Sequence, residues 1–211
     1  MSDHHDPTNR PASIQRQWCL DFTNTVGSHT SGNPVEHLTS FDALIDWGAR
    51  ASILTPTDAD RLREESARHP ARAAAALREA IALREAIYRV FLAVTDGYAP
   101  NPDDLDVLNA ALAEAQTGRR IVYQSRGFAW AWRPEADSYE VLIGSVVLST
   151  VELLNSDQLD RVKRCANDTC GWLFIDTSRN SSRRWCDMSD CGNRAKARRY
   201  YRRSRAPEAD Q

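Results

Sequence analysis

Residues 164–199 read RCANDTCGWLFIDTSRNSSRRWCDMSDCGNRAKARR, and this stretch decides the fold of the C-terminal part of the chain. It holds four of the five cysteines, in two C-x4-C-G units that fifteen residues separate. Two such pairs around a hairpin-length insert are typical of a zinc ion held tetrahedrally by four thiolates. We expect the ligands to fill every position on a structural zinc ion, with none left for catalysis. They are Cys165, Cys170, Cys186 and Cys191.

The alternatives to zinc are disulfides, buried free thiols and an iron–sulfur cluster. Disulfides are rare in the reducing cytoplasm, where we place the chain because its N-terminus has no apolar signal segment and no apolar run could span a membrane. The repeated spacing argues against unrelated free thiols. The glycines that follow the pairs, Gly171 and Gly192, are expected to adopt a positive φ in tight turns. An iron–sulfur cluster would accept the same four ligands. The fifth cysteine, Cys19, is expected to be a small core residue.

The residues between and after the cysteines predict a small treble-clef-like finger. Residues 172–175 predict a strand, residues 177–182 a turn, and residues 183–185 the start of a return strand. Residues 193–203 (NRAKARRYYRR) predict a helix that follows the second cysteine pair. Because so small a unit buries little apolar surface, zinc should supply much of its folding free energy. Its expected core is Trp172, Phe174 and Trp185.

Charge is distributed very unevenly along the chain. Residues 161–205 carry 13 Lys and Arg and four acids, a net charge of +9, which leaves −11 for the rest of a chain whose total is −2. This asymmetry indicates a polyanionic partner such as nucleic acid. The alternative is a basic helix that docks on the acidic first part of the same chain.

The paired donors of arginine suit contacts with phosphate and guanine. On the predicted helix, Arg194, Arg198 and Arg202 are four residues apart and share one face. The candidate nucleic-acid contacts are Arg179, Arg183, Arg184, Asn193, Arg194, Lys196, Arg198, Arg199, Arg202 and Arg203.

The first 160 residues predict a mainly helical domain with one β-hairpin. Residues 138–154 are apolar almost all round, which favours a buried central helix, although Val146-Val147 leave a strand open. The hairpin is predicted at 121–132, with its turn at Arg126-Gly127. We expect a disordered N-terminus at 1–13, the helical domain at 14–160, the finger at 161–205 and a tail at 206–211. The other predicted helices cover 15–26, 39–53, 55–68, 70–97 and 102–116, and residues 27–38 predict a loop.

The C-terminal stretch strongly resembles the CGNR zinc finger, whose name matches the run Cys191-Gly192-Asn193-Arg194. Upstream, WCLDFTNTV at 18–26 resembles the opening of the ABATE domain, which usually precedes that finger. The family is described as stress-induced transcription regulators of bacteria. The resemblance therefore implies a zinc-dependent finger that binds DNA and an N-terminal helical domain whose role is not defined.

We expect a DNA-binding transcriptional regulator and no enzyme, because the sequence has no phosphate-binding glycine loop, nucleophile elbow or HExxH pattern. The helical domain would sense a small-molecule effector or form a homodimer, since one finger makes few base contacts. Asp21 and Asn24 would line the effector pocket or, alternatively, cap or bridge neighbouring segments. RNA binding, or a protein-interaction module with a purely structural finger, is the alternative function.

Overall fold

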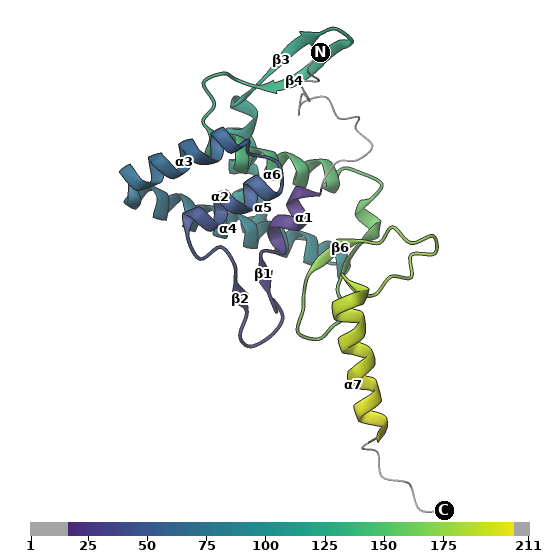
Figure 1. Ribbon diagram of the computed structural model, residues 1–211. Coiled ribbons are helices and arrows are strands. Elements are labelled where there is room, and N and C mark those ends of the chain that lie inside the picture. The colour runs from purple at the N-terminus through teal and green to yellow at the C-terminus, as the bar shows by residue number, and fades with distance from the viewer. Residues whose placement is uncertain (1–16, 205–211) are drawn as a thin grey trace, which may run out of the picture.

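The computed structural model describes residues 17–204 and shows the predicted fold class, a mainly helical body with a small cysteine-rich finger (Figure 1). The expected disordered N-terminus at 1–13 and the tail at 206–211 lie outside the described residues. The helices are α1 (Trp18–Thr23), α2 (Phe41–Arg50), α3 (Pro56–Arg68), α4 (Pro70–Thr95), α5 (Pro102–Thr117), α6 (Ser138–Leu154) and α7 (Asn193–Ser204). The strands are β1 (Val26–Gly27), β2 (Val35–Glu36), β3 (Arg119–Gln124), β4 (Gly127–Trp132), β5 (Val162–Arg164) and β6 (Leu173–Ile175).

Helix starts follow the capping residues that the sequence offers. Ser40 accepts a hydrogen bond from the backbone N–H of Ala43 at the start of α2. Thr55 and Asp58 form a reciprocal capping box at the start of α3, where Pro56 takes the first helical position. These contacts satisfy N–H groups that a helix end leaves without a partner.

The core of the body lies around α6, which is a helix and not the alternative strand. Leu142, Val146 and Val147 on α6 have no exposed surface. The helix packs against α1, α3 and α5. A side chain at position 144 would collide with the ring of Trp132. Because Gly144 has none, Trp132 at the base of the hairpin can pack against α6.

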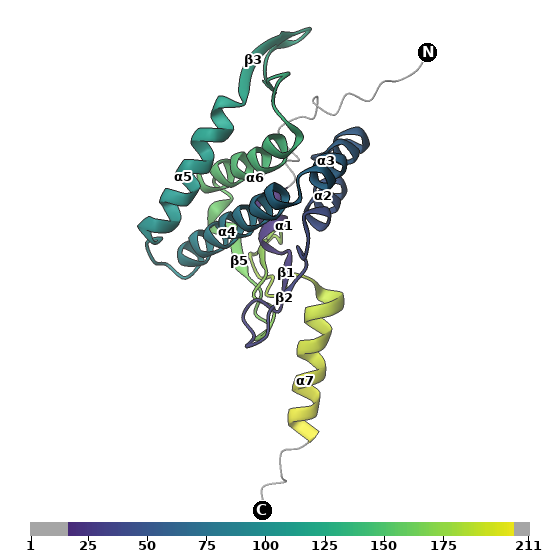
Figure 2. The same cartoon turned by 90° about the vertical axis from the view of Figure 1, so that its left-hand side faces the viewer.

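The predicted hairpin is present as β3 and β4, which pair antiparallel with Ile121 opposite Trp130. Its turn lies at Ser125-Arg126, one residue earlier than predicted, because Gly127 already pairs with Gln124. The hairpin extends from the body at the end opposite to α7, as both views show (Figures 1 and 2).

The N-terminal region differs from its prediction in two places. The first helix spans only Trp18–Thr23, shorter than the predicted 15–26. The predicted loop at 27–38 contains a short antiparallel pair, β1 with β2. Between the two strands, His29 and Thr30 contact the finger.

The predicted return strand at 183–185 was wrong. Strand β6 pairs instead with β5, which precedes the first cysteine. Leu173 and Ile175 of β6 and Val162 of β5 belong to the main hydrophobic core, so burial favours this partner. Beyond β6, the buried carboxylate of Asp176 accepts a hydrogen bond from the N–H of Arg183 and turns the chain away.

Candidate metal centre and basic helix

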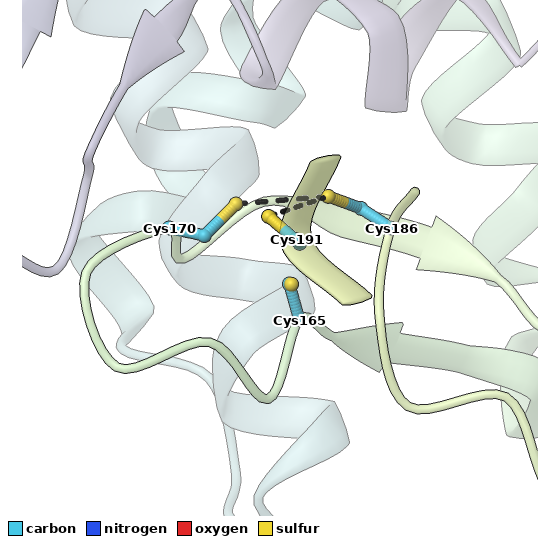
Figure 3. A group of neighbouring side chains, drawn as sticks. All are labelled: Cys165, Cys170, Cys186 and Cys191. Atoms are coloured by element: carbon cyan, nitrogen blue, oxygen red, sulfur yellow. Dashed lines mark hydrogen bonds between the residues drawn. The ribbon is translucent and has the colours of Figure 1, made fainter. Parts of the chain in front are cut away.

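The four cysteines of the finger converge on one point (Figure 3). Cys165 and Cys170 come from the knuckle between β5 and β6, Cys186 from the segment after β6, and Cys191 from the turn that leads into α7. All four sulfurs lie within 4.8 Å of one another. The Sγ atoms of Cys170 and Cys186 are 3.6 Å apart, and those of Cys186 and Cys191 are 3.7 Å apart. Zn–S bonds of about 2.3 Å place tetrahedral sulfurs about 3.8 Å apart, whereas a disulfide needs about 2.05 Å. The arrangement therefore fits a metal held by four thiolates.

The first pair, Cys165 and Cys170, sits in a turn that directs backbone N–H groups at sulfur. The N–H of Asn167 hydrogen-bonds to the sulfur of Cys165, and that of Trp172 bonds to the sulfur of Cys170. Gly171 adopts a φ of +72°, as predicted, because the chain reverses there. These donors stabilise the thiolate form that a metal requires.

The second pair differs, because Gly192 does not have the predicted positive φ. It ends a π-helical turn, Met188–Gly192, that runs directly into α7. A Cβ at Gly192 would lie 3.0 Å from the sulfur of Met188, a tight contact with the end of a flexible side chain. Since Cys191 lies in this turn, a metal bound to it fixes the first turn of α7.

Segment 24–30 of the body holds the knuckle through its backbone. The side-chain amide of Asn24 donates to the carbonyl oxygen of Leu173 at 2.8 Å and accepts from its N–H at 3.0 Å. The N–H of His29 donates to the carbonyl of Cys170, and the hydroxyl of Thr30 donates to that of Asp168. A side chain on Gly171 would meet Thr30 at 2.8 Å, so the two segments are in close contact.

Two aromatic side chains complete this junction between the body and the finger. The indole N–H of Trp172 donates to the carbonyl oxygen of Val26, and the hydroxyl of Tyr88 on α4 donates to that of Gly171. Trp172 therefore reaches the body, whereas Phe174 and Trp185 pack around the cysteines as predicted.

A buried charge network lies behind the junction. Arg84 of α4 is 1% exposed and forms a two-pronged ion pair with Glu36 at 2.6–2.7 Å. It also bonds to Glu85, which in turn contacts the ring of His29 at 3.0 Å. Burial opposes ionisation of Glu85, but hydrogen bonds from His29 and Arg84 outweigh it and lower the pKa of that carboxyl. The ion pairs therefore link helix α4 to the loop that holds the knuckle.

Asp176 is a supporting residue that the sequence analysis did not single out. Its carboxylate is fully buried and accepts from the ammonium of Lys163, the N–H and hydroxyl of Ser178, and the N–H of Arg183. Burial raises the pKa of Asp176, but these bonds outweigh it and hold the pKa well below its usual range. The run Asp-Thr-Ser after a strand is a side-chain turn signal that would have identified it.

The predicted nucleic-acid contacts divide into several groups. Arg183 is half-buried and donates to the carbonyls of Trp185 and Cys186, so its guanidinium supports the metal site. Arg194 pairs with Asp190, and Arg198 donates to the side-chain oxygen of Asn167. The exposed members of the set are Arg179, Arg184, Asn193, Arg194, Lys196 and Arg198, while the side chains of Arg199, Arg202 and Arg203 are outside the described part of the chain.

Within residues 17–204, neither Asp21 nor Asn24 lines either of two cavities beside α4. One, of about 740 Å³, lies between the end of α4 and the finger and is lined by Lys163, Arg164 and Arg184 among others. The second, of about 300 Å³, lies between α3, α4 and Tyr139. Asn24 bridges to the finger, and Asp21 lies on the exposed side of α1.

Comparison with known families agrees with these observations. The profile of the ABATE family, described as "Putative stress-induced transcription regulator", matches residues 16–157, and the profile of the CGNR zinc finger matches residues 161–204. Neither is a family of enzymes. A search of curated proteins returned no match. Within residues 17–204, no helix is long and apolar enough to cross a membrane.

The finger profile spans all four converging cysteines, so the cluster is a structural zinc site. The first profile covers more than half of the sequence. The chain therefore belongs to the ABATE family and carries a CGNR zinc finger at its C-terminal end.

Proposed function

We propose that this chain is a zinc-dependent transcriptional regulator that binds duplex DNA with α7. The observation that supports the proposal best is the position of α7, which begins at the metal site and runs away from the body (Figures 1 and 2). The helix carries six Lys and Arg and no acid. A basic helix fixed at one end and open along its length suits a polyanionic ligand.

The position of the helix argues against the alternative partner within the chain. Its main packing contacts are with the turn Met188–Gly192 that precedes it, and Arg198 contacts Asn167 of the finger. Had the positive charge served to balance the acidic body, the helix would be expected to lie along α3 or α4. Its direction supports an external partner.

The dimensions and side chains of α7 suit a DNA groove. Helix α7 has twelve residues, and at about 1.5 Å per residue it is about 18 Å long. A helix with its side chains is about 10–12 Å in diameter, so α7 can lie in a major groove about 12 Å wide. Arg198 donates a hydrogen bond to Asn167, and Arg194 forms an ion pair with Asp190. These contacts hold both guanidinium groups in place before DNA binds. Lys196 and Arg184 carry exposed charges that suit contacts with the phosphate backbone.

Fluorescence anisotropy with labelled genomic duplexes tests the proposal, with salt as the variable. Each phosphate contact contributes about −0.9 to the slope of log K against log salt. The variant Lys196→Ala should reduce that slope by about 1 and weaken binding at low salt. Arg78→Ala, which removes an exposed arginine from α4, is the matched control and should change neither.

Two results would reject DNA as the ligand. One is zinc-loaded protein without affinity for any duplex at low salt. The other is a structured RNA that displaces the duplex at lower concentration, which would assign the basic surface to RNA.

We propose the body as the regulatory part. The cavity of about 300 Å³ is lined by the rings of Phe41 and Tyr139, by Leu62, and by Glu65 and Glu79. That volume is at the small end of ligand pockets, which range over about 300–1,000 Å³. It supports a small effector, and thermal shift with a metabolite panel tests it, because only a ligand of the native state raises Tm.

A further inference from the structure

The hairpin of β3 and β4 exposes a continuous apolar face that the function proposed above does not use. Ile121 pairs with Trp130 across the strands, and Tyr123 pairs with Phe128, so all four side chains point to the same side. Their exposed fractions are 62%, 57%, 75% and 80% respectively. The rings of Tyr123 and Phe128 meet edge to face at 5.3 Å, which orders the patch.

The body covers only the base of this face. Trp132 is half-buried against Gly144 of α6, while the other aromatic rings lie farther along the hairpin. A two-stranded hairpin is marginally stable in water unless something packs on one face. Exposed patches of this kind usually mark interaction surfaces.

The charges around the hairpin favour a protein partner over nucleic acid. The hairpin region carries Arg119, Arg120, Arg126 and Arg133. Arg119 lies over the ring of Trp130 at 4.7 Å, and Arg133 contacts Glu140. Arg120 lies on the opposite side of the strand and Arg126 in the turn. Protein surfaces that bind single-stranded nucleic acid combine aromatic rings, which stack on the bases, with cationic side chains that follow the phosphate backbone. On this face the cation is the guanidinium of Arg119, which is already stacked on Trp130.

The area suits a second copy of the same chain. An aromatic side chain contributes about 150–250 Å², so with these exposed fractions the four side chains leave about 500 Å² open to water. Two copies packed face to face would bury about 1,000 Å², the size at which specific interfaces begin. The patch consists of two neighbouring cross-strand pairs of similar bulk. In a two-fold dimer, each pair of one copy can therefore pack against a pair of the other copy.

We propose that the face formed by Ile121, Tyr123, Phe128 and Trp130 is the surface through which two copies of this chain form a two-fold dimer. Because the hairpin and α7 lie at opposite ends of the molecule (Figures 1 and 2), the two basic helices point away from the interface. The dimer therefore presents its fingers to separate DNA segments, a consequence that rests on the proposed DNA binding.

Light scattering coupled to size exclusion tests the interface on the full zinc-loaded chain. The wild type should have twice the 23.7 kDa mass of one chain at micromolar concentration. Phe128→Ser/Trp130→Ser should weaken the dimer at least about a hundredfold, since buried aromatic residues dominate interface energies. The matched control, Arg120→Ser/Gln124→Ser, changes two residues on the opposite face of the hairpin and should leave the dimer intact.

Circular dichroism and zinc content check that each variant folds, and Phe128→Lys offers a milder disruption should the double variant unfold. A monomeric wild type at about 100 µM, or a dimer that persists in folded Phe128→Lys, would overturn the proposal. A third result would also overturn it: the wild type is monomeric and binds a single-stranded oligonucleotide, and the double variant does not bind it. Nucleic acid would then cover the face. Lys196→Ala leaves this interface untouched, so failure of DNA binding and failure of dimerisation are separate results.

Discussion

Removing the side-chain amide of Asn24 tests how firmly the finger is joined to the body. In the Asn24→Ala variant, the N–H and carbonyl of Leu173 lose the two hydrogen bonds that Asn24 makes. Leu173 has no exposed surface, and a buried backbone group left without a partner costs about 1–3 kcal/mol. Because Asn24 itself is half-buried, water reaches part of the gap. We therefore expect a loss of about 2–4 kcal/mol, a large share of the stability of a domain.

Urea unfolding followed by circular dichroism measures this loss. Asn155→Ala is the matched control, because its amide makes one local hydrogen bond on an exposed helix end. That variant should stay within about 0.5 kcal/mol of wild type. Zinc transfer to a chelating dye gives a second readout, and it should be faster in Asn24→Ala because β6 follows directly on the knuckle.

A difference below about 0.5 kcal/mol between the two variants would refute the reasoning. It would mean that the hydrogen bonds to Leu173 are replaced by water without loss. An unchanged rate of zinc transfer together with a large loss of stability would mean that the metal site does not depend on the junction with the body.

Three further predictions concern the buried groups of the body. Arg84→Met should destabilise the chain by about 3 kcal/mol in urea unfolding, because Glu36 and Glu85 keep partly buried charges without their partner; an Arg78→Met control should be neutral. The pKa values of Glu36 and Glu85 are lowered in the native state, so their contribution to stability is present at neutral pH and is lost as pH falls through their folded pKa values. The urea midpoint should therefore fall less steeply with decreasing pH in Arg84→Met than in wild type. Burial raises the pKa of Cys19 to about 12, so iodoacetamide at pH 8 should modify it only after unfolding, as mass spectrometry of the peptides would show.

The sequence predicts most of the helical fold because its helices carry local signals. The capping box at Thr55 and the prolines at Pro56, Pro70 and Pro102 mark helix starts that the structure reproduces. The strand pairing of the finger lacked such a signal. Nothing in residues 183–185 distinguishes a strand from an extended loop, and the true partner, β5, lies before the first cysteine. Its choice depends on burial of Val162 against the body, which is a tertiary contact.

The site shows the same division between local and tertiary information. Cysteine spacing predicts the metal ligands, because a four-thiolate site needs pairs at short separation. The role of Asn24 depends on a partner far along the chain, so residue type alone could not assign it. Asn24 is bonded to Leu173 149 positions away. Gly192 shows the limit of analogy within the motif, since its pair is followed by a helix and not by a tight turn.

The alternation of side chains along β6 explains why the metal site and the body depend on each other. Leu173 and Ile175 pack into the main core, while Phe174 between them packs around the cysteines. A strand three residues long cannot keep one set in place while the other moves, because adjacent side chains share one backbone. Loss of zinc therefore disturbs the burial of two core residues, and loosening of the core disturbs a wall of the metal site. A finger built in this way holds α7 at a fixed angle to the body, which a flexible tether between the two could not do.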